Sequence, residues 1–285
     1  MPASKRETST GLAGLPSSTQ PIVVASHRRS GTHLMLDLLR RQFAACRPPF
    51  RFGINPHRYL YFTLDRFGSS HKSPAGPDEC LQMMATTTKP CLKTHAMPDF
   101  ADYSEQARLL CEEVMREGVV LYCVRDVRAV MASLLAFERC ARGGPEVALS
   151  DFIRQEVNGI PRPRVWAGQV QTWLDFKPKP NVMRYENVIS DPTGVVDRLA
   201  GLLDERPLGT EPTLPRKSQL RIRNRWAQFT GIPSSTNVMG RKRGVKPPDW
   251  RTAYSESDLA FLEEHAGDAM RRLGYIKGDD WSTTG

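Results

Sequence analysis

The chain has 285 residues, of which 40% are hydrophobic and 25% charged, a balance typical of an ordinary globular protein. Its length suits one α/β domain with a sizeable core and does not require two. No apolar run approaches the roughly 18–20 residues that a membrane-spanning helix needs, which argues against a membrane protein. The formal net charge of +9 indicates an anionic partner without identifying it.

The ends of the chain differ in composition from its middle. Residues 1–20 are rich in Ser, Thr, Gly and Pro and lack the apolar core of a signal peptide, so we expect a flexible tail. We assign residues 21–278 to a single domain and residues 279–285 to a short C-terminal tail. The six cysteines form no CxxC pair, so we expect buried free thiols in a reducing compartment, with no disulfide framework and no zinc site.

In the first half of the chain, apolar runs alternate with amphipathic segments. The predicted strands are 21–26, 90–98 and 119–126, and the predicted helices are 32–43, 104–118 and 127–141. Residues 47–79 are rich in Pro, Gly and aromatic residues. We expect them to form an irregular excursion over the surface, where substrate-contacting loops usually lie.

The second half continues the alternation less regularly. We predict helices at roughly 148–158, at 164–176, at 191–204 and at 255–275, and a strand at 181–188. Asp191 and Pro192 suit the first positions of the third of these helices, and Ser255 with Asp258 suits a capping box. Strands that alternate with helices predict an α/β fold of three layers, with a central, mainly parallel β-sheet flanked by helices.

The stretch "SHRRSGTHL" (26–34) lies between the first predicted strand and the first predicted helix. This arrangement leaves the first N–H groups of the helix free to bind an anion above the strand end. Arg28 and Arg29 add positive charge. Ser30 and Thr32 add hydroxyl donors, and Gly31 lets the backbone come close to a phosphate. We expect an anion-binding loop; a plain helix start without a ligand is the alternative.

A second group of polar residues follows the most apolar predicted strand. Arg125 lies at the end of that strand, and Ser133 follows in the next helix. A charged arginine in this position is costly unless it faces solvent or an anion. The alternative is a surface arginine that pairs with the neighbouring Asp126.

The strand "LKTHAMP" (92–98) carries a candidate base. Lys93 and His95 alternate with Thr94, so on a strand their side chains lie on the same side. The unperturbed pKa of histidine lies near neutrality, which suits a general base. A structural histidine is the alternative.

Positive charge is concentrated between residues 216 and 251, where Asp249 is the one acidic residue. Within this region "GRKRGVKPPDW" (240–250) is a basic loop flanked by glycines and suited to folding over a phosphate. A solvated basic face is the alternative.

Taken in order, these segments resemble the sulfotransferases that use 3′-phosphoadenosine 5′-phosphosulfate (PAPS), especially the soluble cytosolic type and its bacterial relatives. That family has a "PKSGTTW" phosphosulfate loop, an "IKTHLP" strand, a "VRNPxDxxxS" strand and helix, and a late "RKGxxGDW" loop. The corresponding stretches here are "HRRSGTHL", "LKTHAMP", "VRDVRAVMAS" and "RKRGVKPPDW". The resemblance covers roughly residues 21–275. It implies an α/β fold with a P-loop-like phosphosulfate-binding loop.

The resemblance also implies roles for the matching residues. The catalytic positions are His95 as the base, Arg29 as the stabiliser of charge on the leaving phosphate, and Lys93 as a sulfonate contact. The donor-binding positions are Arg28, Arg29, Ser30, Gly31, Thr32, His33, Arg125, Ser133, Tyr185, Arg241, Lys242, Arg243 and Gly244. Among these, Arg125 and Ser133 match ligands of the 3′-phosphate, and Tyr185 matches a residue near the adenine.

The chain departs from the family pattern at several positions, and Asp126-Val127 in place of Asn-Pro is one of them. Arg29 replaces a lysine, and a guanidinium binds phosphate well but is a poor proton donor, which favours electrostatic stabilisation. His33 replaces a threonine, and Leu34 replaces the tryptophan that stacks on adenine. The late loop has one residue more than the family pattern and no second glycine.

The expected reaction is the in-line transfer of a sulfonate group from PAPS to a hydroxyl or amine, which leaves 3′-phosphoadenosine 5′-phosphate (PAP). We expect a small soluble acceptor, no metal, no nucleic-acid or membrane partner, a cytoplasmic location and, as a possible assembly, a homodimer. Residues 47–79, 137–165 and about 225–240 are expected to build the acceptor pocket. His57 or His71 could contact the acceptor there, while His27 and His33 are expected to be incidental to the chemistry beyond the donor contact assigned to His33.

Two other functions are alternatives. A P-loop-like nucleotide kinase or phosphotransferase should show a Gly-Lys-Ser/Thr ending and a strand that ends in a Mg²⁺-binding Asp, whereas here Arg125 precedes Asp126. A basic nucleic-acid-binding protein should carry basic residues along one face with stacking aromatics. The positive residues of this chain instead flank one loop and one strand end.

Overall fold

The computed structural model describes residues 15, 17–49, 60–142, 146–209, 211–212, 247–277 and 281, without the side chains of 140–142. Most of the two predicted tails, 1–20 and 279–285, lies outside the described residues. The strands are β1 (Ile22–Ser26), β2 (Phe62–Thr63), β3 (Cys91–Thr94), β4 (Val119–Val124), β5 (Glu156–Val157), β6 (Ile160–Pro161) and β7 (Asn181–Arg184). The α-helices are α1 (Thr32–Gln42), α2 (Pro77–Met84), α3 (Glu105–Glu117), α4 (Val127–Arg142), α5 (Leu149–Arg154), α6 (Arg162–Asp175), α7 (Tyr185–Ser190), α8 (Pro192–Leu203), α10 (Trp250–Ala253) and α11 (Glu256–Arg272), and two short 3₁₀ helices are η1 (Ala44–Cys46) and η3 (Leu64–Phe67).

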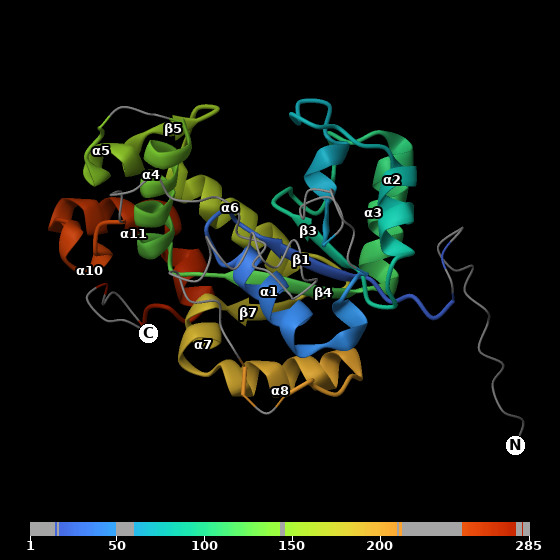
Figure 1. The fold of residues 1–285 in the computed structure, drawn as a ribbon. Coiled ribbons are helices and arrows are strands. Elements are labelled where there is room, and N and C mark those ends of the chain that lie inside the picture. Colours follow the sequence, from blue (N-terminus) through green and yellow to red (C-terminus); the bar gives the residue numbers. More distant parts are fainter. Residues whose placement is uncertain are drawn as a thin grey trace, which may run out of the picture.

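In the described part of the chain, five strands form one parallel sheet in the order β2-β3-β1-β4-β7. β1 is the central strand, and all five of its residues are buried. A parallel strand covered on both faces needs such a continuous apolar run, which is why "IVVAS" lies here. The sheet runs through the middle of the molecule, and helices pack on both of its faces (Figure 1). The predicted three-layer α/β fold is confirmed.

Successive residues of β1 point into two separate cores, as the period of a strand requires. Ile22 and Val24 pack with residues of α1, α7 and α8 on one face. Val23 and Ala25 pack on the other face with residues of α2, α3, α4, α6 and α11. The sheet is therefore held rigidly between two helical layers, and its carboxyl edge is a firm platform for side chains.

The expectation of an irregular excursion at 47–79 is wrong for part of that segment. Residues 62–63 form the edge strand β2, which pairs with β3 through Phe62 opposite Leu92 and Thr63 opposite Lys93. η3 follows it directly, and α2 begins at Pro77. The burial of Phe62, Leu64 and Phe67 in the core explains the difference, because these aromatic and aliphatic residues serve packing. Residues 50–59, including His57, lie outside the described residues.

Two other boundaries also differ from the prediction. The helix expected at 148–158 ends at Arg154, and the β5–β6 hairpin follows it with positive φ angles at Asn158 and Gly159. The strand expected at 181–188 ends at Arg184, and Tyr185 begins α7. Apolar residues occur on both sides of this junction, at Val182, Met183, Tyr185 and Val188, so their spacing alone did not reveal where the strand ends and the helix begins.

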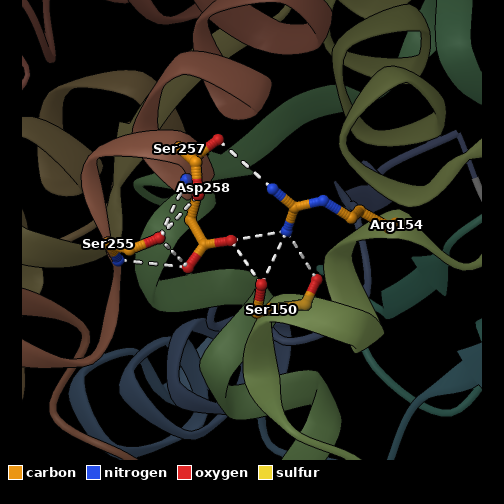
Figure 2. A network of polar contacts seen from close by, with 5 residues as sticks. All are labelled: Ser150, Arg154, Ser255, Ser257 and Asp258. Atoms are coloured by element: carbon orange, nitrogen blue, oxygen red, sulfur yellow. Dashed lines mark hydrogen bonds and ion pairs between the residues drawn. The ribbon is translucent and has the colours of Figure 1, made fainter.

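The predicted helix starts are confirmed at α8 and α11. The side chain of Asp191 accepts a hydrogen bond from the N–H of Gly194 at 2.9 Å, with Pro192 in the first turn. At α11, Ser255 and Asp258 form a full capping box. Asp258 also accepts hydrogen bonds from Ser150 (2.6 Å) and Arg154 (2.5 Å), so this one carboxylate ties α11 to α5 (Figure 2).

Five of the six cysteines lie in the described part of the chain as buried free thiols, as expected: Cys46, Cys80, Cys91, Cys111 and Cys123. The side chain of Cys140 is not described. Every helix in the described part of the chain is too short or too polar to cross a membrane.

Candidate functional site

The loops that follow β1, β3 and β4 emerge side by side at one edge of the sheet, because β1 pairs with both neighbours in parallel register. Ala25 lies opposite Thr94 on one side, and Ser26 lies opposite Cys123 on the other. The chain passes from β1 to the strands on one side and then crosses to β4 on the other. Such a switch in strand order leaves a crevice at the carboxyl edge, where ligands of open α/β sheets bind.

The loop between β1 and α1 has the features of an anion cradle. Gly31 has a φ of +103° and no side chain caps the first turn of α1, which also contains no acidic residue. The Oγ atom of Ser30 is fully buried and has no hydrogen-bond partner among the described residues. A Cβ at Gly31 would come within 2.8 Å of the Tyr185 ring, so only glycine fits. The helix N–H groups and the orphaned hydroxyl suit an anionic ligand.

Arg29, in the same loop, points its guanidinium toward α4. Its Nε donates to Ser133 Oγ at 3.2 Å, and the guanidinium carbon lies 4.9 Å from the centre of the Phe137 ring. Its φ of +72° is uncommon for a residue with a Cβ. The structure thus joins two predicted site residues, Arg29 and Ser133, that are far apart in the sequence.

Arg125 lies above Tyr185, with the guanidinium carbon 4.2 Å from the ring centre. Its Nη1 donates to the carbonyl oxygen of Arg29 at 3.3 Å, and its buried Nε has no partner among the described residues. The alternative in which Arg125 pairs with Asp126 is wrong. Asp126 is buried and pairs instead with buried Arg128, at 2.7 Å. Its two oxygens accept several hydrogen bonds from Arg128, so this carboxylate is already engaged.

A cavity of about 290 Å³ lies beside Arg125. Two arginines and three aromatic rings line it together with two carboxylates and two aliphatic side chains: Arg125, Arg251, Tyr185, Trp250, Tyr275, Asp126, Glu186, Ala129 and Ile189. Both carboxylates already have partners, since Asp126 pairs with Arg128 and Glu186 accepts a hydrogen bond from Tyr275. The cavity therefore suits the base, ribose and phosphate parts of a nucleotide better than a purely apolar ligand.

His95 directly follows β3, and a hydrogen bond of its ring fixes the orientation of its side chain. Its Nδ1 lies 2.8 Å from the carbonyl oxygen of Ser26. A carbonyl only accepts hydrogen bonds, so Nδ1 carries the proton and Nε2 keeps its lone pair. Burial, followed by the positive charge of Lys93, lowers the pKa of His95 well below its usual 6.5. The imidazole is therefore neutral near pH 7, the state that a general base requires.

Lys93 lies on β3, with its amine 5.9 Å from the centre of the Tyr61 ring. Burial lowers its pKa, the carboxylate of Asp65 raises it, and Arg28 lowers it further, with a net decrease. The side chain of Thr94 lies on the opposite face of the strand, where its hydroxyl donates a hydrogen bond to Asp65 at 2.8 Å. Lys93 and His95 are close enough for the charge of one to affect the pKa of the other, as their alternation on the strand predicts.

The remaining predicted residues are distributed as follows. Thr32 contacts Ser26 through its hydroxyl, and the ring of His33 meets Tyr61 edge-on at 5.7 Å. His27 bonds the carbonyl of Arg28, and burial lowers its pKa to about 4. The ring of His71 bonds Ser73 in a local turn. The four residues of the closing loop, Arg241, Lys242, Arg243 and Gly244, lie outside the described residues.

The sequence did not predict three of the contacts that His95 makes in the structure. These are the carbonyl of Ser26, the side chain of Asp65 and the side chain of Gln169, whose Nε2 donates to the carbonyl of His95 at 2.6 Å. Asp65 lies in the segment predicted to be irregular, and Gln169 lies in a helix to which no function was assigned. Neither has a spacing relative to His95 that could have revealed the contact.

In the described part of the chain, no three or more His, Cys, Asp and Glu side chains are grouped as a metal site would require. The side chains predicted for this edge that the structure describes are arginine, lysine, histidine, tyrosine and hydroxyl groups. This set binds phosphate-like and sulfate-like anions by charge and hydrogen bonds.

A family model described as a sulfotransferase domain matches residues 19–274. Solved structures with the same fold include retinol dehydratase in complex with androsterone and the inactive cofactor PAP, at 16% identity, a TM-score of 0.51, and coverage of 91% of this chain and 83% of that one. A mouse sulfotransferase complexed with PAP matches at 13% identity, a TM-score of 0.53, and coverage of 90% and 86%. A sulfotransferase from Alicyclobacillus acidocaldarius matches at 13%, with a TM-score of 0.51 and coverage of 89% and 95%. No curated protein sequence matches the chain.

Proposed function

The chain belongs to the sulfotransferase-domain family, and from this premise we propose that it transfers a sulfonate group from PAPS to a hydroxyl or amine of a small soluble acceptor. The observation that carries the proposal is the contact of His95 Nδ1 with the carbonyl oxygen of Ser26 at 2.8 Å, which places the ring proton on Nδ1 and leaves the lone pair on Nε2 to accept a proton. It lies at the same sheet edge as the anion cradle and Arg125. A base beside two anion sites is the minimum that the reaction needs.

The described residues fit the donor at both of its charged ends. Ser30, Gly31 and Thr32 would hold the 5′-phosphosulfate, with Arg28 and Arg29 supplying charge; the orphaned Ser30 hydroxyl supports this role. Arg125 and Ser133 would hold the 3′-phosphate. The unpartnered Nε of Arg125 supports that role, and the hydroxyl of Ser133 can donate to a phosphate while it accepts from Arg29.

Three further assignments complete the donor site. Tyr185 would lie near the adenine, because its ring borders the cavity beside Arg125. His33 would contribute a contact from the first turn of α1. Arg241, Lys242, Arg243 and Gly244 would close over the phosphates. The roles of these four loop residues rest on the resemblance alone, because the loop is outside the described residues.

In PAPS the sulfonate is joined to the 5′-phosphate through a bridging oxygen, as a mixed anhydride whose cleavage is favourable. Nε2 of His95 takes the proton of the acceptor as the acceptor oxygen or nitrogen bonds to sulfur. The bond between sulfur and the bridging oxygen breaks, and its electron pair stays on the phosphate. Arg29 and Lys93 stabilise the negative charge that spreads over the sulfonate and the phosphate. Arg29 remains protonated throughout, because a guanidinium does not give up its proton in proteins.

The proposal includes a small molecule as the acceptor. Retinol dehydratase was solved with androsterone, a small molecule. A small acceptor is consistent with a base that is part-buried. Incubation of the protein with ³⁵S-labelled PAPS and a panel of phenols, alcohols and amines, followed by separation of the products, tests this proposal. Transfer of label to one class supports it, and no transfer to any acceptor or cell extract would contradict it.

The role of the base is tested by His95→Ala. We expect this variant to bind PAP as well as the wild type does and to lose turnover by about 10²-fold or more, the usual contribution of a general base. His265→Ala is the matched control, because it removes another shielded imidazole, on α11, which packs against Phe261. An undiminished rate in His95→Ala would remove His95 from this role.

A further inference from the structure

Asp65 makes an unusual pair of contacts from the short helix η3. A single oxygen of its carboxylate, Oδ1, accepts hydrogen bonds from the hydroxyl of Thr94 and from the backbone N–H of His95, both at 2.8 Å. The Thr94 hydroxyl in turn accepts from the N–H of Ala96 at 3.0 Å. A single carboxylate oxygen thus accepts two hydrogen bonds from the turn that follows β3.

His95 is fixed at three points by three different parts of the chain. Its N–H is bound by Asp65 from η3, its carbonyl by Gln169 from α6, and its ring by the carbonyl of Ser26 at the end of β1. Among these, Asp65 is the one charged partner, and hydrogen bonds to charged groups are the stronger ones. It also acts on the residue directly after the strand ends, where the backbone has left the sheet ladder.

We propose that Asp65 is a positioning residue for the base: its carboxylate fixes the turn at Thr94–His95 so that Nδ1 stays on Ser26 and Nε2 faces the acceptor. The proposal rests on the function proposed above, since it concerns the same base. Asp65 does not touch the reacting atoms. Without it, the N–H of His95 and the hydroxyl of Thr94 lose their acceptor, and the ring is free to leave the Ser26 carbonyl.

Asp65 is itself held by its neighbours in the chain. Arg66, the next residue, donates to both oxygens of Glu79 on α2 at 2.5 and 3.0 Å. Phe62 of β2 and Phe67, the last residue of η3, pack in the core with ring centres 5.3 Å apart. The pair Arg66–Glu79 thus anchors the same segment without contacting His95, which makes it a matched control for loss of stability alone.

The test compares Asp65→Ala, Asp65→Asn and Glu79→Gln in the full chain. The first readout is the ¹⁵N NMR spectrum of histidine-labelled protein, with His95→Ala used to assign the His95 signals. In the wild type we expect a proton on Nδ1 and none on Nε2. Asp65→Ala should lose this single tautomer, whereas Asp65→Asn should keep it, because one amide oxygen can accept both hydrogen bonds. Glu79→Gln should also keep it.

The second readout is turnover with ³⁵S-labelled PAPS and the best acceptor of the panel. We expect Asp65→Ala to lower kcat by about 10²-fold, the effect of a misplacement of about 1 Å, while KM for PAPS and the thermal shift caused by PAP stay unchanged. Asp65→Asn should restore most of kcat. Glu79→Gln should lower the melting temperature without lowering kcat.

The outcomes separate this proposal from the proposed function. If the wild type transfers sulfonate and His95→Ala does not, but Asp65→Ala keeps both the tautomer and kcat, Asp65 has no positioning role and the proposed function stands. If Glu79→Gln loses as much kcat as Asp65→Ala, the effect is one of stability and the proposal is overturned. If the wild type transfers no sulfonate, the proposed function fails, and the NMR comparison still decides whether Asp65 holds His95.

Discussion

Arg29 carries one of the two positive charges of the anion loop, and its backbone conformation has a cost. A φ of +72° disfavours residues with a Cβ by roughly 1 kcal/mol, so the surroundings must hold it in place. They do so at two points, since Nε donates to Ser133 and the carbonyl accepts from Arg125. A strained residue held in this way is pre-organised, and its charge needs no rearrangement when a ligand arrives.

Removal of this charge should therefore affect the rate more than the fold. We expect Arg29→Ala to lower kcat for sulfonate transfer by about 10²–10³-fold, as loss of one electrostatic stabiliser does in other sites. Arg29→Lys should retain much of the rate, because a lysine ammonium still supplies the charge. Steady-state kinetics of the two variants check this, and equal losses in both would contradict a purely electrostatic role.

The pH dependence should reflect the lowered pKa of His95. Burial and Lys93 disfavour the charged imidazolium, so the neutral base persists as the pH falls below 6.5. We expect kcat/KM for PAPS to stay level from pH 7 down through 6.5 and to decline only at lower pH. A decline centred at or above 6.5 would show that an unshifted imidazole governs the reaction.

At the scale of elements, the strands and helices of the first half could be predicted well, because β1, β3 and β4 are short apolar runs between clear helix patterns. The boundaries that failed have physical causes. Tyr185 begins α7 in a segment of mixed polar and apolar residues that also suits a strand. Residues 62–67 supply core side chains from a Pro- and Gly-rich segment. Composition cannot distinguish a surface loop from an edge strand when the aromatic residues face the core.

The junction of α5 and α11 gives a testable case at this scale. Asp258 is buried and accepts hydrogen bonds from Ser150, Arg154 and Ser255 (Figure 2). Burial raises the pKa of Asp258, but these hydrogen bonds together outweigh it and lower the pKa to about 2. A carboxylate with a lowered pKa stabilises the fold above the unfolded value, and this contribution is lost as the pH falls toward the folded value.

We expect Asp258→Ala to lower the free energy of unfolding by about 2–3 kcal/mol at pH 7, from a lost helix cap and a lost buried acceptor. The difference in the free energy of unfolding between this variant and the wild type should become smaller as the pH falls from about 4 toward 2. Denaturant unfolding across this range measures it. Asp268→Ala, which removes an exposed acid on the same helix, is the control and should change stability little. A loss that did not depend on pH would contradict the account.

At the scale of the whole molecule, the site joins residues from all along the chain. The motif order allowed the loop, His95 and Arg125 to be predicted, and the parallel register of β3, β1 and β4 explains why they meet at one edge. The residues that support His95 could not be predicted in the same way. Asp65 and Gln169 contact it across separations of 30 and 74 residues, and only the packing of η3 and α6 against β3 brings them there.

The central claim is that Arg125 and the loop after β1 bind the two phosphates of a 3′,5′-bisphosphorylated adenosine. The most direct measurement is the thermal shift caused by PAP, AMP and ATP in the wild type, in Arg125→Ala and in the control Arg108→Ala, which removes an exposed arginine of α3. We expect PAP to raise the melting temperature of the wild type far more than AMP or ATP does. Arg125→Ala should abolish most of that difference, and Arg108→Ala should leave it intact. Equal shifts from the three nucleotides, or a preference for PAP that survives in Arg125→Ala, would contradict the account.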